Sequence, residues 1–199
     1  MNQLTILLRS TIFVIGVTSI LLAALNDLRL KIIILSIQYV GVFILVAQSW
    51  PVNLALVKVV AGWMTCAVLG ITVKKNRYRE KRVTRENISG IIFRFLGTVL
   101  IVLTIIAVTP TLSKWFIAVN TEQLFGGSLL IGIGLLIIGM YSSSMDVFIG
   151  LLTLLSGFEI LYSAMEISVL VAGLLAAITL GIALVGAYLY ILEATGDAA

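Results

Sequence analysis

Lys58 and Glu159 are single, opposite charges within otherwise apolar stretches of the sequence. A charge near the centre of a bilayer costs at least about 2.5–3.5 kcal/mol on insertion scales, so such residues usually face protein or water and serve a function. Burial disfavours the charged form of a carboxyl group, so Glu159 can be neutral in one state and ionised in another. A buried lysine can exchange protons with a nearby acid for the same reason. The pair therefore indicates proton-transfer chemistry.

Glu159 shares a helix face with three hydroxyl-bearing residues. Ser156, Tyr162 and Ser163 lie three or four positions away, whereas the rest of this stretch is apolar. We expect Glu159 to take part in a relay or a packing network, with Ser156 and Tyr162 as secondary candidates. The alternative is an interfacial glutamate that faces lipid headgroups.

Lys58 and Gln38 extend the list of candidates to other helices. Lys58 lies six residues after Val52, the expected start of its helix, so its side chain either exchanges protons in the interior or extends outward to the interface. Gln38 is near the middle of its stretch, where an amide usually joins helices by hydrogen bonds worth about 1–2 kcal/mol. It can also hold a water in a relay. Glu166 follows Met165 in a turn and is a further secondary candidate.

The elements that position these residues are predicted to be membrane helices. The chain has 199 residues, of which 61% are hydrophobic and 11% are charged, whereas about 25% of a soluble domain is charged. Continuous apolar runs of roughly 17–25 residues favour helices over the alternating strands of a barrel. We therefore predict an all-α, multi-pass membrane bundle of about seven helices. The expected spans are 4–25, 30–48, 52–73, 88–109, 124–141, 145–164 and 167–192.

The distribution of basic residues predicts the orientation. Seven lysines and arginines lie between positions 74 and 85, and Arg29 and Lys31 lie in the first turn; together these are nine of the chain's thirteen. Basic loops remain in the cytoplasm, which places the amino terminus outside and the carboxyl terminus inside. We divide the chain into a three-helix section with the basic loop, residues 1–86, and a four-helix section, residues 87–199.

Helix ends and packing are predicted from prolines, glycines and two further arginines. Pro51 and Pro110 are expected to terminate helices. Small residues at four-residue spacing (Gly173, Ala177 and Gly181), and five glycines between positions 126 and 139, predict close packing within the chain or against partner subunits. Arg9 and Arg94 lie near the starts of spans, where we expect them to reach an interface.

Several classes of site are disfavoured by the composition. The chain has no histidine and a single cysteine, Cys66, so haem ligation by imidazole, most zinc sites and a disulfide framework are not expected. No phosphate-binding loop or nucleophile arrangement is present. We therefore expect no metal and no cofactor. We also expect no nucleic-acid partner, because the basic loop is accounted for by topology.

The segment from Leu135 to Tyr190 resembles the small K subunit of respiratory complex I. Both have three consecutive helices with an acid in the middle helix, and Gly157-Phe158-Glu159-Ile160 resembles that family's Gly-Leu-Glu-Ile motif. Leu175-Ala176-Ala177 with Gly181-Ile182-Ala183-Leu184 resembles its third helix. The family's second glutamate lies in the last helix, and the matching position here is near Ile178, so that glutamate is missing. The turn at Ser142–Ser144 also lacks the family's usual basic residues.

The longer chain resembles the E-type membrane protein of group 4 nickel–iron hydrogenases, which has extra helices before a section like the K subunit. Arg29-Leu30, Gln38 and Lys58 match in that comparison. The resemblance implies that Glu159 is a proton-path glutamate. It further implies a non-catalytic membrane subunit of a complex-I-like, hydrogenase-like or antiporter-related assembly, with other membrane subunits as partners and a bacterial or archaeal plasma membrane as its location. A self-contained transporter or channel, a purely structural subunit and an integral-membrane enzyme remain alternatives.

Overall fold

The computed structural model describes residues 3–75, 88–116, 119–141 and 143–196, and within these ranges every regular element is a helix. The chain is a multi-pass membrane protein: six helices are long and apolar enough to cross a bilayer, and α1 adds a shorter apolar stretch, Ser10–Ala24. This confirms the predicted fold class. The helices are α1 Gln3–Ala24, α2 Leu28–Val46, α3 Val52–Lys75, α5 Ile88–Trp115, α6 Thr121–Met140, α7 Ser144–Met165 and α8 Val169–Gly196.

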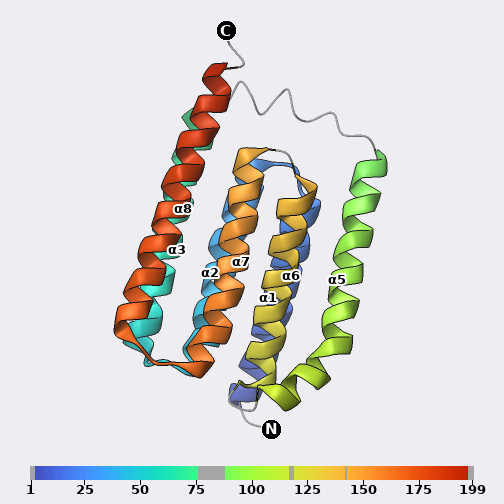
Figure 1. Ribbon diagram of the computed structural model, residues 1–199, viewed down its shortest axis with the longest axis vertical. Helices are drawn as coiled ribbons and strands as arrows, with labels where there is room; N and C mark the ends of the chain where they lie inside the picture. The colour runs from blue at the N-terminus through green and yellow to red at the C-terminus, as the bar shows by residue number, and fades with distance from the viewer. Residues whose placement is uncertain (1–2, 76–87, 117–118, 142, 197–199) are drawn as a thin grey trace.

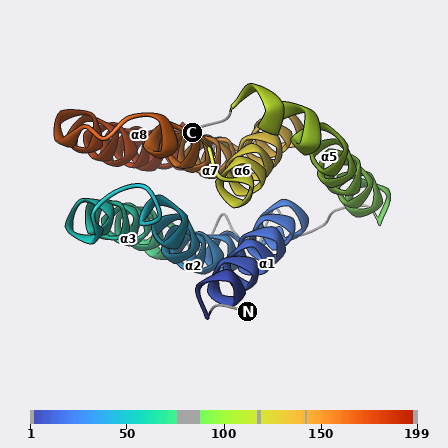
Figure 2. The same cartoon turned by 90° about the horizontal axis from the view of Figure 1, so that it is seen from below.

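The helices form two layers that repeat the same order. Figure 2 shows α1, α2 and α3 in one row and α6, α7 and α8 in the other, with α5 beside α1 and α6. Across the layers α1 packs on α6, α2 on α7 and α3 on α8, and the helices of each pair run in the same direction (Figure 1). The centre of the bundle is therefore the interface between α2 and α7, flanked by α3 and α8.

Glycines hold α6 and α7 at backbone contact. A Cβ atom added to Gly134 would lie 2.7 Å from the Gly150 carbonyl oxygen, and one added to Gly157 would lie 2.5 Å from the Gly127 carbonyl oxygen. Without Cβ atoms at these points the two backbones approach each other closely, as small residues allow in membrane helix pairs. The predicted close packing through the glycines of α6 is confirmed for this helix pair.

The small-residue ridge of α8 does not pack within the described fold. A Cβ atom added to Gly173 or to Gly181 would meet nothing within 4 Å. The expectation of close packing at these positions is therefore not met inside the chain, and packing against a partner subunit stays a prediction.

Pro110 lies inside α5, so the prediction that it terminates the helix was wrong. The helix continues for five residues, to Trp115. Proline removes one backbone hydrogen bond, and side chains near it can form others in a membrane helix. The Thr109 hydroxyl donates to the Ile105 carbonyl at 2.6 Å, and the Ser113 hydroxyl donates to the Pro110 carbonyl at 3.0 Å. Figure 1 shows the last turns of α5 bending toward α6.

The turns predicted to face the cytoplasm lie at one end of the bundle. The α1–α2 turn, the end of α3, the α6–α7 turn and the end of α8 are together at the top of Figure 1. Lys74 and Lys75 end α3 there, whereas the rest of the basic loop and the side chain of Arg9 lie outside what the structure describes. This end is called the basic end below, and its orientation toward the cytoplasm stays a prediction.

Candidate functional site

Lys58 and Glu159 form a buried ion pair between α3 and α7. The Lys58 Nζ donates to the Glu159 Oε1 at 2.5 Å, although the two residues are 101 positions apart in the sequence. The side chains are 3% and 2% exposed. Burial of Lys58 excludes the alternative in which its side chain extends outward to the interface, whereas proton exchange by this residue stays a prediction.

Equal depth in the two helices brings the pair together. Lys58 lies six residues after the start of α3 at Val52, and Glu159 lies six residues before the end of α7 at Met165. Six residues of helix rise about 9 Å. The Trp50 indole N–H donates to the Glu166 carbonyl at 2.9 Å and so joins the α2–α3 turn to the end of α7.

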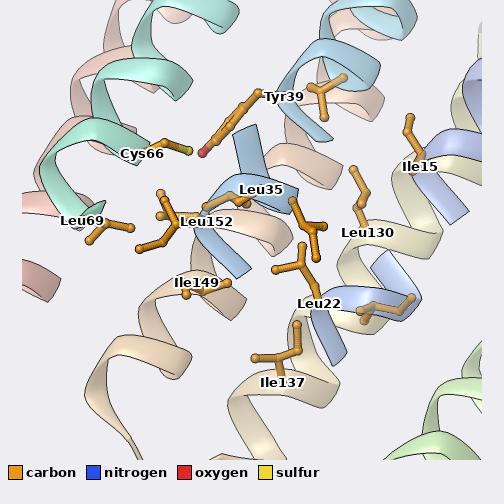
Figure 3. Close-up of a cluster of buried hydrophobic side chains, with 14 of the residues drawn as sticks. Ile15, Leu22, Leu35, Tyr39, Cys66, Leu69, Leu130, Ile137, Ile149 and Leu152 are labelled. Carbon is orange, nitrogen blue, oxygen red and sulfur yellow. The ribbon is translucent and has the colours of Figure 1, made fainter. Parts of the chain in front are cut away.

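Two further helices supply polar groups around the pair. Tyr39 of α2 is 2% exposed, and its ring packs directly on Gly62 of α3. Its hydroxyl points toward the Cys66 side chain (Figure 3) and lies within electrostatic reach of Glu159. Thr179 of α8 lies beside the Glu159 carboxylate. Helices α2, α3, α7 and α8 thus meet at one polar site, called the Glu159 site.

The Glu159 site allows a proton to move without separating charge. Transfer of one proton from the Lys58 ammonium to the Glu159 carboxylate converts an ion pair into a neutral amine and a neutral acid. Two buried charges carry a desolvation cost of several kcal/mol each, which their attraction offsets only with good geometry. The ionic and neutral forms are therefore closer in energy here than in water, which is a requirement for a relay.

The three secondary candidates have different positions. Ser156 is 2% exposed and its hydroxyl donates to the Leu152 carbonyl at 2.8 Å, so it lies on the buried face with Glu159. Tyr162 is only half-buried, and its ring stacks on the exposed Phe158, with 6.0 Å between the ring centroids. Glu166 is exposed and caps the end of α7. Neither Tyr162 nor Glu166 belongs to the Glu159 site.

Gln38 is buried in the bundle but does not join helices by hydrogen bonds. Its side chain is 1% exposed, and neither the amide oxygen nor the amide nitrogen has a hydrogen-bond partner among the described residues. The interhelical hydrogen bonds expected of Gln38 are therefore not formed among the described residues, and its place in a proton path stays a prediction. The glutamine that does join helices is Gln123, whose amide nitrogen donates to the Leu45 carbonyl at 2.8 Å and to the Ser49 hydroxyl at 2.9 Å.

These two glutamines predict opposite effects on stability. Gln38→Leu should leave the free energy of unfolding unchanged or raise it, because no hydrogen bond to protein is lost. Gln123→Leu should lower it by about 1–3 kcal/mol, because buried partners are left unpaired. Unfolding of both variants in mixed micelles measures the difference. A larger loss for Gln38→Leu than for Gln123→Leu would contradict this assignment.

A second buried ion pair, which sequence reasoning missed, lies at the basic end. The Lys31 Nζ of α2 donates to the Asp146 Oδ1 of α7 at 2.6 Å, and their side chains are 0% and 9% exposed. Lys31 also lies 3.7 Å from the centroid of the Tyr141 ring. Lys31 was interpreted as a turn residue, and Asp146 was not singled out. The sequence signal for this pair was that the two residues carry opposite charges at equivalent positions, the first turn of their helices.

Arg94 belongs to this second cluster, so the prediction that it reaches an interface was wrong. It is 8% exposed and donates to the Asn26 side chain and to the Tyr141 hydroxyl, the latter at 3.0 Å. Its guanidinium lies 3.9 Å from the centroid of the same aromatic ring that Lys31 contacts. The Tyr141 hydroxyl donates to the Ala23 carbonyl at 3.0 Å. Helices α1, α2, α5 and α7 are thereby connected at the basic end.

Comparisons with known proteins add no assignment to this geometry. No protein-family model, no curated protein and no solved structure matches the chain. Among the described residues no group of three or more Cys, Asp and Glu side chains is close enough to hold a metal ion. The two buried ion pairs are therefore the features from which a function can be inferred.

Proposed function

We propose that this chain is a non-catalytic membrane subunit that contributes a lateral proton path to a complex-I-like, hydrogenase-like or antiporter-related assembly in a bacterial or archaeal plasma membrane. The observation that carries the proposal is the 2.5 Å pair of Lys58 and Glu159, buried between α3 and α7. Buried ionisable groups in membrane helices are costly, so they are functional by default. The described residues form membrane helices, and in this proposal the energy for transport comes from partner subunits.

The path runs across the bundle through groups on neighbouring helices. Glu159 accepts a proton from one side of the path, and Lys58 releases a proton to the other side. The pair passes between its ionic and neutral forms in each cycle. Tyr39 and Thr179 provide hydroxyls next to the carboxylate. No redox cofactor is needed within this chain, because its task is proton transfer alone.

Proton translocation by the intact assembly tests the proposal. The tagged chain is purified in mild detergent with the proteins that accompany it, and the complex is reconstituted into vesicles that contain a pH-sensitive dye. Glu159→Gln should slow translocation by about 100-fold or more, the loss typical when a positioned proton-transfer group is removed. The amide still offers an oxygen to Lys58, so we expect the complex to assemble.

Glu166→Gln is the matched control, because it makes the same change on an exposed residue at the end of the same helix. It should leave translocation unchanged. Equal translocation by Glu159→Gln and wild type would refute the relay. Loss of assembly in Glu159→Gln would instead support a structural subunit, and transport by the purified chain alone would support a self-contained transporter.

A further inference from the structure

We propose that Lys31 and Asp146 form a second proton-exchange site, which connects the water at the basic end to the Glu159 site along the α2–α7 interface. This inference rests on the proposed function and adds a route and a gate to it. It is carried by three observations: a second buried ion pair at the basic end, buried polar side chains between the two pairs, and a layer of apolar side chains that separates them.

The first observation is the position of the Lys31–Asp146 pair. Both residues are in the first turn of their helices, next to the turns at the basic end, yet both are buried. Lys31 and the neighbouring Arg94 both lie against the Tyr141 ring. A carboxylate held by lysine at a helix start is close enough to the aqueous phase to exchange protons with it.

The second observation is a line of polar side chains on the buried face of α7. Asp146, Thr153, Ser156 and Glu159 follow at spacings of seven, three and three residues, and all are at most 6% exposed. At 3.6 residues per turn the four positions turn by about 140° in all, so the line winds around α7 from Lys31 of α2 to Lys58 of α3. Asp146 and Glu159 are thirteen residues apart, which corresponds to about 20 Å along the axis. A single proton hop cannot cover this distance, so intermediate groups are required.

Gln38 and Tyr39 of α2 supply intermediate groups. Gln38 is seven residues after Lys31, about 10 Å further along the bundle, and Tyr39 reaches the Glu159 site. The Gln38 amide is buried without a hydrogen-bond partner in the described part of the protein, and the buried Tyr39 hydroxyl faces Ser156. Buried polar groups of this kind bind water. Water held here continues the path from the Glu159 site toward the basic end.

The third observation is an apolar layer between the Lys31–Asp146 pair and these groups. Leu35 of α2 and Ile149 and Leu152 of α7 are each 0% exposed. Figure 3 shows Leu35 and Leu152 between Tyr39 and Ile149. We call these three residues the apolar gate. Protons cross it only when the gate admits water, so the resting protein does not leak.

The decisive variant replaces the second pair by apolar residues of similar volume. Such replacements of buried ion pairs usually preserve folding, so Lys31→Met/Asp146→Leu should assemble with its partners. The complex should translocate protons about 100-fold more slowly than wild type, as expected when proton-transfer groups are lost. Wild-type translocation in this double variant, measured beside an inactive Glu159→Gln complex, would overturn the second site and leave the proposed function intact. Wild-type translocation in Glu159→Gln would refute the proposed function itself.

The gate provides an independent test if the double variant does not assemble. Leu152→Ser should hydrate the layer and raise passive proton leak of the reconstituted, unenergised complex. Leu155→Ser, on a less buried face of α7, is the control and should leave the leak at the wild-type level. A Leu152→Ser complex that leaks no more than its control would overturn the route.

Discussion

Lys58→Met and Glu159→Leu should each lower the free energy of unfolding by about 3–5 kcal/mol, because each leaves one charge buried without its partner. The pair is 3% and 2% exposed, so water cannot compensate for the lost partner. The double variant Lys58→Met/Glu159→Leu should regain most of that loss, since apolar groups of similar volume are usually tolerated in place of a buried ion pair.

Unfolding of the four proteins in mixed micelles, treated as a double-mutant cycle, gives the coupling between the two side chains. Proton translocation should be lost in all three variants, including the stable double variant. That combination separates the two roles of the pair, because stability returns while transport does not. A double variant no more stable than the two single variants would contradict a direct pair interaction.

Gly157→Ala should destabilise the protein strongly, because the new methyl group meets backbone atoms of the neighbouring helix. The new Cβ atom would lie 2.5 Å from the Gly127 carbonyl oxygen and 2.8 Å from the Ile131 backbone nitrogen. Both are backbone atoms of α6, so the two helices have to separate and cannot simply change a rotamer. Overpacking of this kind costs about 1–3 kcal/mol and occasionally more. Transport should also fall, since Glu159 is two residues away on the same helix.

Gly173→Ala is the matched control, because its Cβ atom would meet nothing within 4 Å. It should be neutral or stabilising by up to about 1 kcal/mol, the difference in helix propensity between alanine and glycine. Thermal unfolding of the two variants in the same detergent measures the contrast. Similar melting temperatures for Gly157→Ala and Gly173→Ala would show that the α6–α7 backbones are not in contact.

Apolar run length was sufficient to predict the helices. Every expected span corresponds to an observed helix, because an apolar helix in lipid satisfies its own backbone hydrogen bonds whatever its neighbours are. The exception is the end of α5, where Pro110 stays inside the helix. Hydroxyl groups on either side of the proline form hydrogen bonds to the backbone there, and a rule based on proline alone omits them.

Glu159 and Lys58 were recognisable from their chemistry alone, since a charge within an apolar run is unusual wherever it points. Their partnership was not, because 101 residues separate them and the packing of α3 and α7 against α2 and α8 sets their common depth. Lys31 and Asp146 were missed because they lie next to turns and not within an apolar run. Charges in turns are ordinary, and the sequence does not show that these two turns meet at one end of the bundle.

The sequence by itself therefore determined that the chain lies in lipid, where most of its helices begin and end, and which charges are too costly to be incidental. The tertiary structure alone decided that Lys58 pairs with Glu159, that Lys31 and Asp146 form a second pair, and that Leu35, Ile149 and Leu152 lie between the two pairs. The physical reason is the range of the forces involved. Transfer into lipid and backbone hydrogen bonding act within one helix, whereas pairing of charges depends on the register of helices that are distant in the chain.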